Sequence, residues 1–135
     1  MPHIVVEYSS NIRDRMDLDR LIERLHATAI GTGVFPLGGT RTRAAERTHY
    51  RIADGHPDNA FVHVTLRIGH GRDADTRARA AQAVFDALCA HLAPLYDAIP
   101  LGISFELQEI DPALSFRKNN LHEYVSARQA GRDRP

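Results

Sequence analysis

The spacing of apolar residues along the chain predicts four strands and two helices. Short runs that are continuously apolar, or apolar at every second position, are typical of strands, whereas apolar residues three and four positions apart form one face of a helix. Polar segments, several of them containing glycine, separate these runs. The expected strands are 3–8, 40–53, 60–69 and 100–110, and the expected helices are 17–29 and 75–95.

The order strand, helix, strand occurs twice, first from His3 and again from Phe61. In each half, a polar loop with an arginine and a helix that starts at an aspartate follow the first strand. A strand–helix–strand crossover is right-handed and places its two strands in parallel. We therefore predict an α+β fold in which two βαβ units form a four-stranded mixed sheet with two helices on one face.

Two helices cover only one face of such a sheet. Val5 lies opposite Ile4 and Val6 in the first strand, and Phe61 lies opposite its apolar neighbours in the third, so both faces are expected to carry apolar side chains. An uncovered apolar face of this kind indicates burial against other subunits. The simplest prediction is a homo-oligomer with closed rotational symmetry.

In the C-terminal part of the chain, the spacing of apolar residues is less regular than in the predicted strands and helices. Residues 112–125 are expected to be irregular or to form a short helix, and the polar segment 126–135 to be disordered. The chain has 135 residues, a common length for one domain. We therefore expect a single domain over residues 2–125.

Composition excludes several classes of function. The 17 basic and 17 acidic side chains cancel, so the chain offers no broad attraction to nucleic acid or to a membrane surface. The one cysteine, Cys89, cannot form a disulfide within the chain, which fits a reducing compartment. There is neither a signal-peptide pattern nor an apolar run long enough to cross a membrane. These properties predict a cytoplasmic protein without nucleic-acid or membrane partners.

The first candidate for chemistry is Pro2. Methionine followed by a small residue such as proline is normally removed in the cell, which would leave Pro2 as a free secondary amine. Burial and neighbouring cations lower the pKa of an amine, and a base that titrates near neutral pH suits proton transfer at carbon. The alternative is that proline simply follows methionine, as it does in many unrelated proteins.

Three arginines are the next candidates. Arg41 and Arg43 follow the glycines of "PLGG", and Arg72 follows Gly69 and Gly71. The planar guanidinium group pairs with carboxylates through two hydrogen bonds, although a surface position in water is the alternative for each arginine. The scattered histidines and the single cysteine show no spacing that predicts a metal site.

Several segments together resemble the tautomerase superfamily and, within it, the 5-carboxymethyl-2-hydroxymuconate Δ-isomerases. The resemblance spans residues 2 to about 124 and keeps the N-terminal proline, the FPL-x-G-x-R block and the F-x-x-NN block in order and spacing. The segments that carry it are "PHIVVEYSSNI" at 2–12, "TGVFPLGGTRTR" at 32–43, "ADG" at 53–55, "AFVHVTLRIGHGR" at 60–72, "ISFELQEIDPALSFRKNN" at 103–120 and "LHEY" at 121–124.

The resemblance implies a homotrimer and a reaction that needs no cofactor or metal. Pro2 would be the catalytic base and then the acid, carrying a proton between a dienol and its conjugated ketone. The implied substrate is 5-carboxymethyl-2-hydroxymuconate, a small tricarboxylate formed in bacterial homoprotocatechuate (4-hydroxyphenylacetate) breakdown.

The resemblance also suggests which side chains hold this substrate. Arg41 is expected to bind the 2-oxo and 1-carboxylate end, and Arg72 and then Arg43 are the next candidates for carboxylate binding. Phe61 and Phe116, together with Phe35, are candidates for apolar walls of the pocket or, alternatively, for core residues.

Two alternative functions stay open at this point. The same fold and proline could catalyse another reaction on an unsaturated carboxylate, such as hydration of a haloacrylate-like acid, which would require a carboxylate to activate water. The scaffold could also be a trimeric binding protein without activity.

Overall fold

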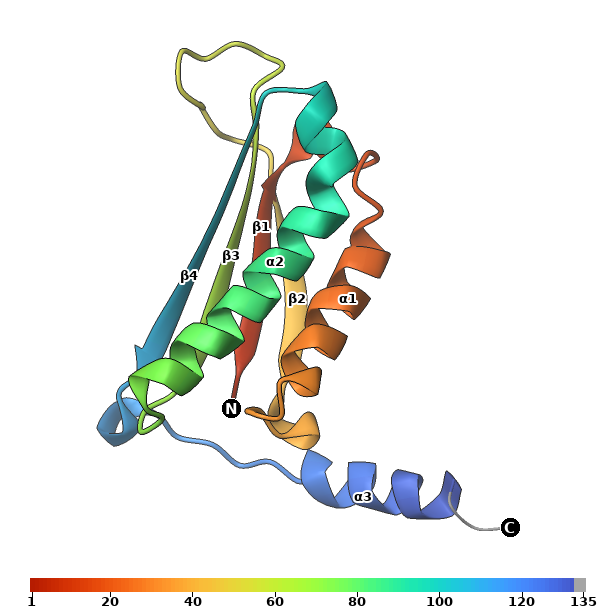
Figure 1. Cartoon of the computed structure of the whole chain (residues 1–135), viewed down its shortest axis with the longest axis vertical. Coiled ribbons are helices and arrows are strands. Elements are labelled where there is room, and N and C mark those ends of the chain that lie inside the picture. Colours follow the sequence, from red (N-terminus) through yellow and green to blue (C-terminus); the bar gives the residue numbers. More distant parts are fainter. Residues whose placement is uncertain (133–135) are drawn as a thin grey trace.

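The structure is a computed structural model that describes residues 1–132, and it is built around one mixed sheet with two long helices packed against it (Figure 1). Among these residues, no helix combines the length and the apolar character that a membrane span requires. The strands are β1 (His3–Ser9), β2 (Arg41–Arg47), β3 (Ala60–Gly69) and β4 (Leu101–Ile110), and the helices are α1 (Leu18–Gly31), α2 (Ala74–Ala98) and α3 (Leu121–Arg132).

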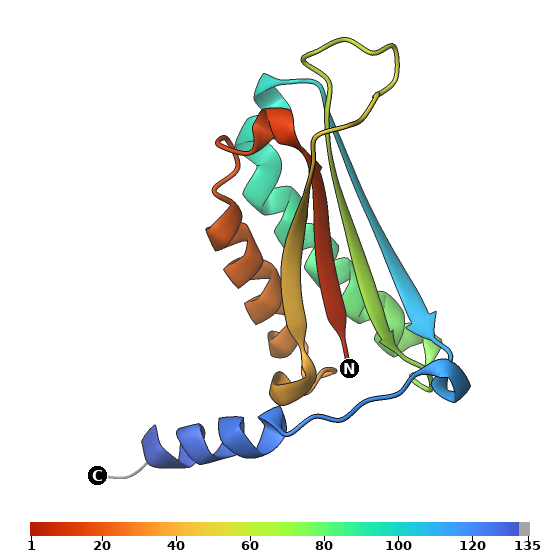
Figure 2. The same ribbon diagram turned by 180° about the vertical axis from the view of Figure 1, so that it is seen from behind.

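The topology confirms the predicted fold. The strand order in the sheet is β2-β1-β3-β4. The pairs β1–β2 and β3–β4 are parallel, whereas β1 and β3 run antiparallel and join the two βαβ units. Helices α1 and α2 lie side by side on one face of the sheet, and Figure 2 shows the opposite face without a helix.

The core lies between the sheet and these two helices. Alternate residues of β1 and β3 point toward the helices and are fully buried, as are the residues that face them from α1 and α2. Burying each large aliphatic side chain contributes about 1.5–3 kcal/mol to stability. The fully buried set includes Ile4, Val6, Val62, Val64, Leu66, Leu21, Leu25, Val84 and Leu88.

The helix-free face differs from the prediction that both faces would be rich in apolar side chains. Because successive residues of a strand alternate between faces, the buried apolar residues of β1 and β3 lie on the helix side, and within these two strands only Ser9 is buried outside this alternation. The other face is mainly polar: Arg47 Nε donates to Glu7 Oε2 at 2.6 Å, and His63 Nε2 lies 2.9 Å from Glu106 Oε1. The predicted apolar surplus was therefore wrong.

Strand β2 is shorter than the predicted strand at 40–53. It ends at Arg47, after which the chain leaves the sheet. Ala53 and Gly55 have φ values of 52° and 82°, in the left-handed region that a strand cannot accommodate. The Asn59 side chain donates to the Ile52 carbonyl at 3.0 Å and fixes this loop.

The C-terminal segment also differs from the prediction. Residues 126–132, expected to be disordered, continue helix α3, and residues 133–135 lie outside the described residues. Asn119 Oδ1 accepts a hydrogen bond from the Leu121 backbone N–H at 2.9 Å and so caps the start of the helix. The Asn119 side chain also donates to the Gly38 carbonyl at 3.1 Å, which ties α3 to the turn Leu37–Gly39.

Candidate active site

The beginning of β1 positions Pro2 beside Arg41. Pro2 is buried, and its carbonyl accepts a hydrogen bond from the Arg41 backbone N–H at 3.0 Å. This bond extends the parallel ladder of β1 and β2, in which His3 is the partner of Arg41. The chain start and Arg41 are therefore held next to each other by the sheet itself.

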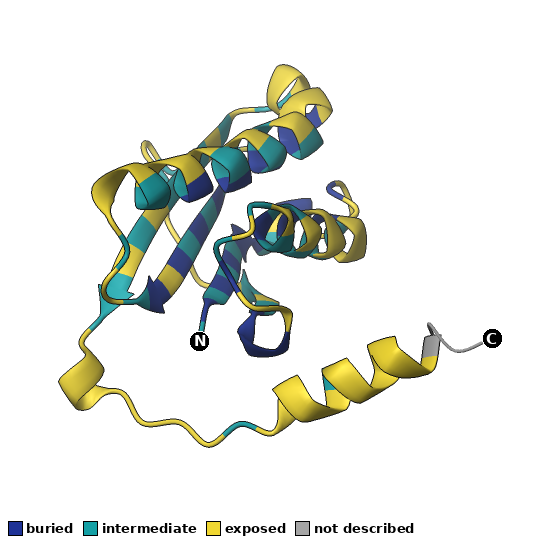
Figure 3. Ribbon diagram, turned by 60° about the horizontal axis from the view of Figure 1, so that its bottom comes forward, coloured by how far each residue is buried: buried dark blue, intermediate teal, exposed yellow. Residues whose placement is uncertain are grey.

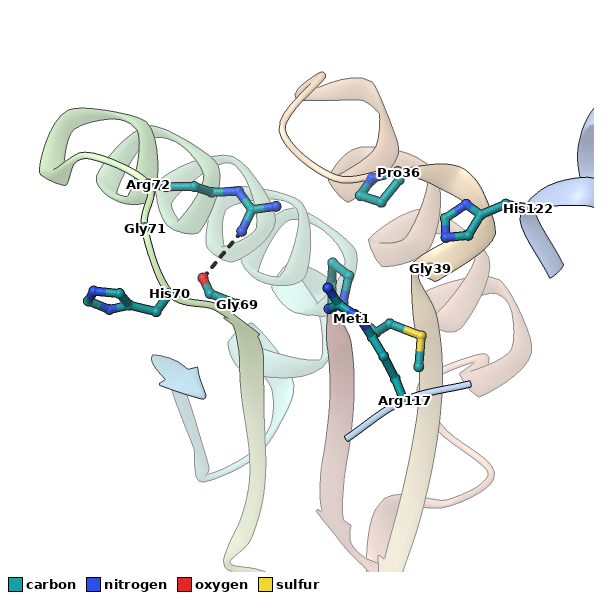
Figure 4. Close-up of a pocket in the computed structure, with 10 residues that line it drawn as sticks. Met1, Pro36, Gly39, Gly69, His70, Gly71, Arg72, Arg117 and His122 are labelled. Carbon is teal, nitrogen blue, oxygen red and sulfur yellow. Dashed lines mark hydrogen bonds between the residues drawn. The ribbon is translucent and has the colours of Figure 1, made fainter. Parts of the chain in front are cut away.

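A cavity of about 610 Å³ lies at this end of the sheet. Three connections meet there, namely the turn before β2, the loop after β3 and the segment that follows β4 (Figure 4). The volume is in the range of small-molecule sites. The residues around the cavity include Met1, Pro2, His70, Arg72, Arg117 and His122.

Arg72 is held rigidly at the wall of the cavity. Its Nη1 donates to the Gly69 carbonyl and its Nη2 to the Val34 carbonyl, each at 3.3 Å. The guanidinium carbon lies 5.2 Å from the centre of the buried Phe35 ring, a cation–π arrangement. Phe35 is thus a core residue that also supports a cation of the site.

Arg41, at the start of β2, does not itself line the cavity but contacts two residues that do. Its Nη1 lies 3.1 Å from Met1 Sδ and 3.4 Å from the Gly39 carbonyl. The Met1 sulfur therefore occupies a position on the Arg41 guanidinium group that another hydrogen-bond acceptor could take. Removal of Met1 would vacate this position and leave the Pro2 nitrogen as the first atom of the chain.

The structure does not bring three of the predicted site residues to the cavity. Arg43 lies farther along β2, where its Nη1 contacts His3 Nδ1 at 3.1 Å. Phe61 lies near the opposite end of β3 and packs edge-to-face on Tyr50, with ring centroids 6.4 Å apart. Phe116 is 91% exposed. Within one chain, the expected aromatic wall from Phe61 and Phe116 is absent.

Sequence reasoning missed three basic residues that line the cavity: Arg117, His70 and His122. Arg117 directly follows Phe116 in the segment "SFRKNN". The sequence therefore indicated the right segment, but Phe116 was predicted as its site residue in place of Arg117. His70 Nδ1 lies 3.1 Å from Glu109 Oε2, and Glu109 also pairs with Arg77. No aspartate or glutamate lines the cavity within the described residues.

The amino group at the chain start has a shifted pKa. Burial, followed by the positive charges of Arg117, Arg72 and Arg41, lowers the pKa of the Met1 amine from its ordinary value of 8.0. Both causes disfavour the ammonium form. An amine at this place is therefore a neutral base at a lower pH than in a free peptide.

This environment predicts an effect of Arg117 on titration. In protein that retains Met1, Arg117→Ala should raise the pKa of the amine, because removal of a cation makes the ammonium form less unfavourable. The pH dependence of acylation by an amine-specific reagent measures this pKa. Lys118→Ala, which removes the adjacent charge, is the control, and an identical rise in both variants would contradict the prediction.

Among the described residues, no group of three or more histidine, cysteine, aspartate or glutamate side chains is arranged so that it could hold a metal ion. The ionisable groups of the cavity are instead an amine, guanidinium groups and imidazoles. Such a set can accept and return a proton and can hold several carboxylates.

Comparison with known proteins identifies close relatives. A family model described as 5-carboxymethyl-2-hydroxymuconate isomerase matches residues 2–125. The curated 5-carboxymethyl-2-hydroxymuconate Delta-isomerase of Escherichia coli is 42% identical over 122 residues, which cover 90% of this chain and 97% of that protein.

Solved structures agree with this match. The 5-carboxymethyl-2-hydroxymuconate isomerase from Deinococcus radiodurans R1 has a TM-score of 0.86 and 32% identity, covering 92% of this chain and 93% of that one. A fused 4-OT wild-type symmetric trimer, at 16% identity and a TM-score of 0.66, covers 91% of this chain and 98% of its own and shares the fold.

Proposed function

Because this chain belongs to the 5-carboxymethyl-2-hydroxymuconate isomerase family, we propose that it isomerises 5-carboxymethyl-2-hydroxymuconate with the Pro2 amine as the proton carrier. The observation that carries this proposal is the cavity at Pro2, which Arg72 also lines and where Arg41 contacts Met1. We further propose that the reaction serves homoprotocatechuate breakdown, as the resemblance implies, and that it takes place in the cytoplasm, as the composition predicts.

The proposed reaction moves one proton from oxygen to carbon. The neutral Pro2 amine takes the proton of the 2-hydroxyl group, which leaves a dienolate. The resulting ammonium group then delivers the proton to C5, and the double bonds shift to give the conjugated ketone. No atom is gained or lost, and a base with a pKa near neutrality can serve in both steps.

Two arginines are proposed to stabilise this charge. Arg41, whose Nη1 contacts Met1 Sδ, would hold the 2-oxygen and the 1-carboxylate once Met1 is removed. Arg72, fixed by two backbone carbonyls, would bind a second carboxylate. Cations already in place at a developing oxyanion are among the largest contributions to catalysis.

The cavity favours isomerisation over hydration. Activation of a water molecule would require a general base besides the proline, in most cases a carboxylate. Glu109, which pairs with the lining residue His70, also pairs with Arg77 and does not line the cavity. An isomerase needs only the amine and the cations.

The proposed function is tested by an ultraviolet assay of untagged protein. Loss of dienol absorbance and appearance of the conjugated ketone are expected at protein concentrations where the uncatalysed rate is small. If the protein does not convert this substrate, the proposed substrate is wrong, and closely related dienols with fewer carboxylates become the next candidates.

We also propose that each chain forms one domain and that three chains form a homotrimer. The support is the similarity to a structure described as a symmetric trimer. We expect light scattering to give a mass close to three times the 15.1 kDa of one chain, independent of concentration in the micromolar range. A monomeric or dimeric mass would contradict the trimer.

A further inference from the structure

The segment between β4 and α3 passes beneath the end of the sheet at which β1 begins (Figures 1 and 2). It comprises the short turn Pro112–Leu114 and an irregular stretch up to Asn120, and we call residues 111–120 the strap. Most of the strap is exposed, as Figure 3 shows. It is held at its far end, where the Asn119 side chain donates to the Gly38 carbonyl and α3 begins.

One side chain of the strap points into the cavity. Arg117 lines it, whereas the neighbouring Phe116 is 91% exposed and Lys118 is not part of the lining. In Figure 4 the Arg117 side chain extends toward Met1. Its charge is also the largest electrostatic cause of the lowered pKa of the Met1 amine, ahead of Arg72 and Arg41.

Arg117 differs from the other two arginines in having no partner within residues 1–132. Arg72 donates to two backbone carbonyls, and Arg41 contacts Gly39 and Met1. No hydrogen bond or ion pair of Arg117 is present among the described residues. A cation directed into a cavity and left unpaired is suited to an anionic ligand.

The proposed substrate has three carboxylates, one more than Arg41 and Arg72 are proposed to bind. With the 1-carboxylate at Arg41 and the 6-carboxylate at Arg72, the carboxylate that is left belongs to the carboxymethyl group on C5, the carbon that receives the proton. We propose that Arg117 binds this carboxymethyl carboxylate, and that the strap thereby selects tricarboxylates over the analogue with hydrogen in place of the carboxymethyl group. This inference rests on the proposed function for the identity of the substrate.

The first test compares two substrates in the variants Arg117→Ala and Lys118→Ala. At a pH above the pKa of the amine, where the amine is neutral in wild type and variants alike, loss of a charged hydrogen-bonding partner should raise KM for the tricarboxylate about 10- to 100-fold with little change in kcat. For the analogue without the carboxymethyl group, KM should change less than about threefold. Lys118→Ala removes the same charge one residue away and should leave both substrates nearly unaffected.

Three results would overturn the assignment. These are an equal loss for both substrates in Arg117→Ala, no change for either, or the same loss in Lys118→Ala. Circular dichroism and thermal melting check that each variant is folded. Arg117→Lys keeps the positive charge but lacks the planar guanidinium group that pairs with a carboxylate through two hydrogen bonds, and it should recover part of the tricarboxylate preference.

A binding experiment separates this inference from the proposed function. Calorimetry measures the affinity of saturated, unreactive tricarboxylate and dicarboxylate analogues for untagged protein and for Arg117→Ala. A tricarboxylate preference that requires Arg117 supports the inference even if the protein does not catalyse the isomerisation. Equal preference in both proteins overturns it even if the isomerisation is observed.

The tie at Asn119 provides a second, indirect test. Asn119 is a positioning residue, because its side chain holds the strap to Gly38 and caps α3. Asn119→Ala should raise KM for the tricarboxylate selectively, by about 3- to 10-fold. Asn120→Ala is the matched control, since no side-chain hydrogen bond of Asn120 is present in the described residues.

A double variant shows whether Asn119 acts through Arg117. If it does, Arg117→Ala combined with Asn119→Ala should be no worse than Arg117→Ala alone. Fully additive losses, or a loss in Asn119→Ala that is equal for both substrates, would show that Asn119 does not act through Arg117.

Discussion

A peptide or acetyl group on the Pro2 nitrogen is expected to lower kcat/KM by about 10²- to 10⁴-fold, the usual contribution of general acid–base catalysis. An acylated nitrogen has no basic lone pair, and the added residues would also fill the cavity, as Met1 does where its sulfur meets Arg41. The measurement compares protein with an uncleaved N-terminal tag and the same protein after a protease has released Pro2.

The control for this experiment is the same tag placed after residue 135, which should leave activity unchanged because α3 leads away from the chain start (Figure 1). Intact mass spectrometry establishes in each sample whether Met1 is present. Full activity of the uncleaved protein would exclude Pro2 as the proton carrier and would leave His70 or His122 as the remaining bases of the cavity.

Substitution of Arg41 by alanine is expected to lower kcat by about 10²- to 10³-fold, the cost of removing one group that stabilises an oxyanion. Arg41 is held next to Pro2 by the bond from its backbone N–H to the Pro2 carbonyl at 3.0 Å. Because that bond belongs to the backbone, Arg41→Ala should preserve the sheet and remove only the guanidinium group. Single-turnover and steady-state kinetics with the tricarboxylate measure the effect.

Arg43 provides a closely matched control. It lies two residues farther along β2 and carries the same charge, but it contacts His3 rather than the cavity. Arg43→Ala should change kcat less than about threefold, the small effect typical of an exposed charge. Equal losses in Arg41→Ala and Arg43→Ala would mean that the general positive charge of this sheet edge, rather than a contact of Arg41, supports the reaction.

The sheet and its two helices were predictable because their apolar spacing is strong and local. The features that sequence reasoning missed depend on contacts between distant segments. The end of β2 depends on a loop that is held by the side chains of Asn11 and Asn59. Helix α3 depends on Asn119, which bonds to a carbonyl 81 residues earlier in the chain. No periodicity in a polar tail reveals such a partner.

The site, like the fold, was predictable only in part from the sequence. Pro2 and Arg72 line the cavity, and Arg41 contacts Met1 there. Phe61 does not reach it because β3 runs antiparallel to β1, which places the first residue of β3 far from the first residue of β1. Whether Phe116 or Arg117 faces the cavity is decided by the path of the strap, and two adjacent residues in an extended segment point in different directions.

Because β1 starts at the third residue, directly after Pro2, two copies of this gene cannot be joined head to tail without covering the second Pro2 nitrogen. The proposed reactive atom belongs to the end of a chain, so each polypeptide supplies only one. In a head-to-tail duplication, the second copy would carry its proline as an internal amide and would be inert, however well it folded. A trimer assembled from separately translated chains, as proposed, would keep one free Pro2 amine for every copy.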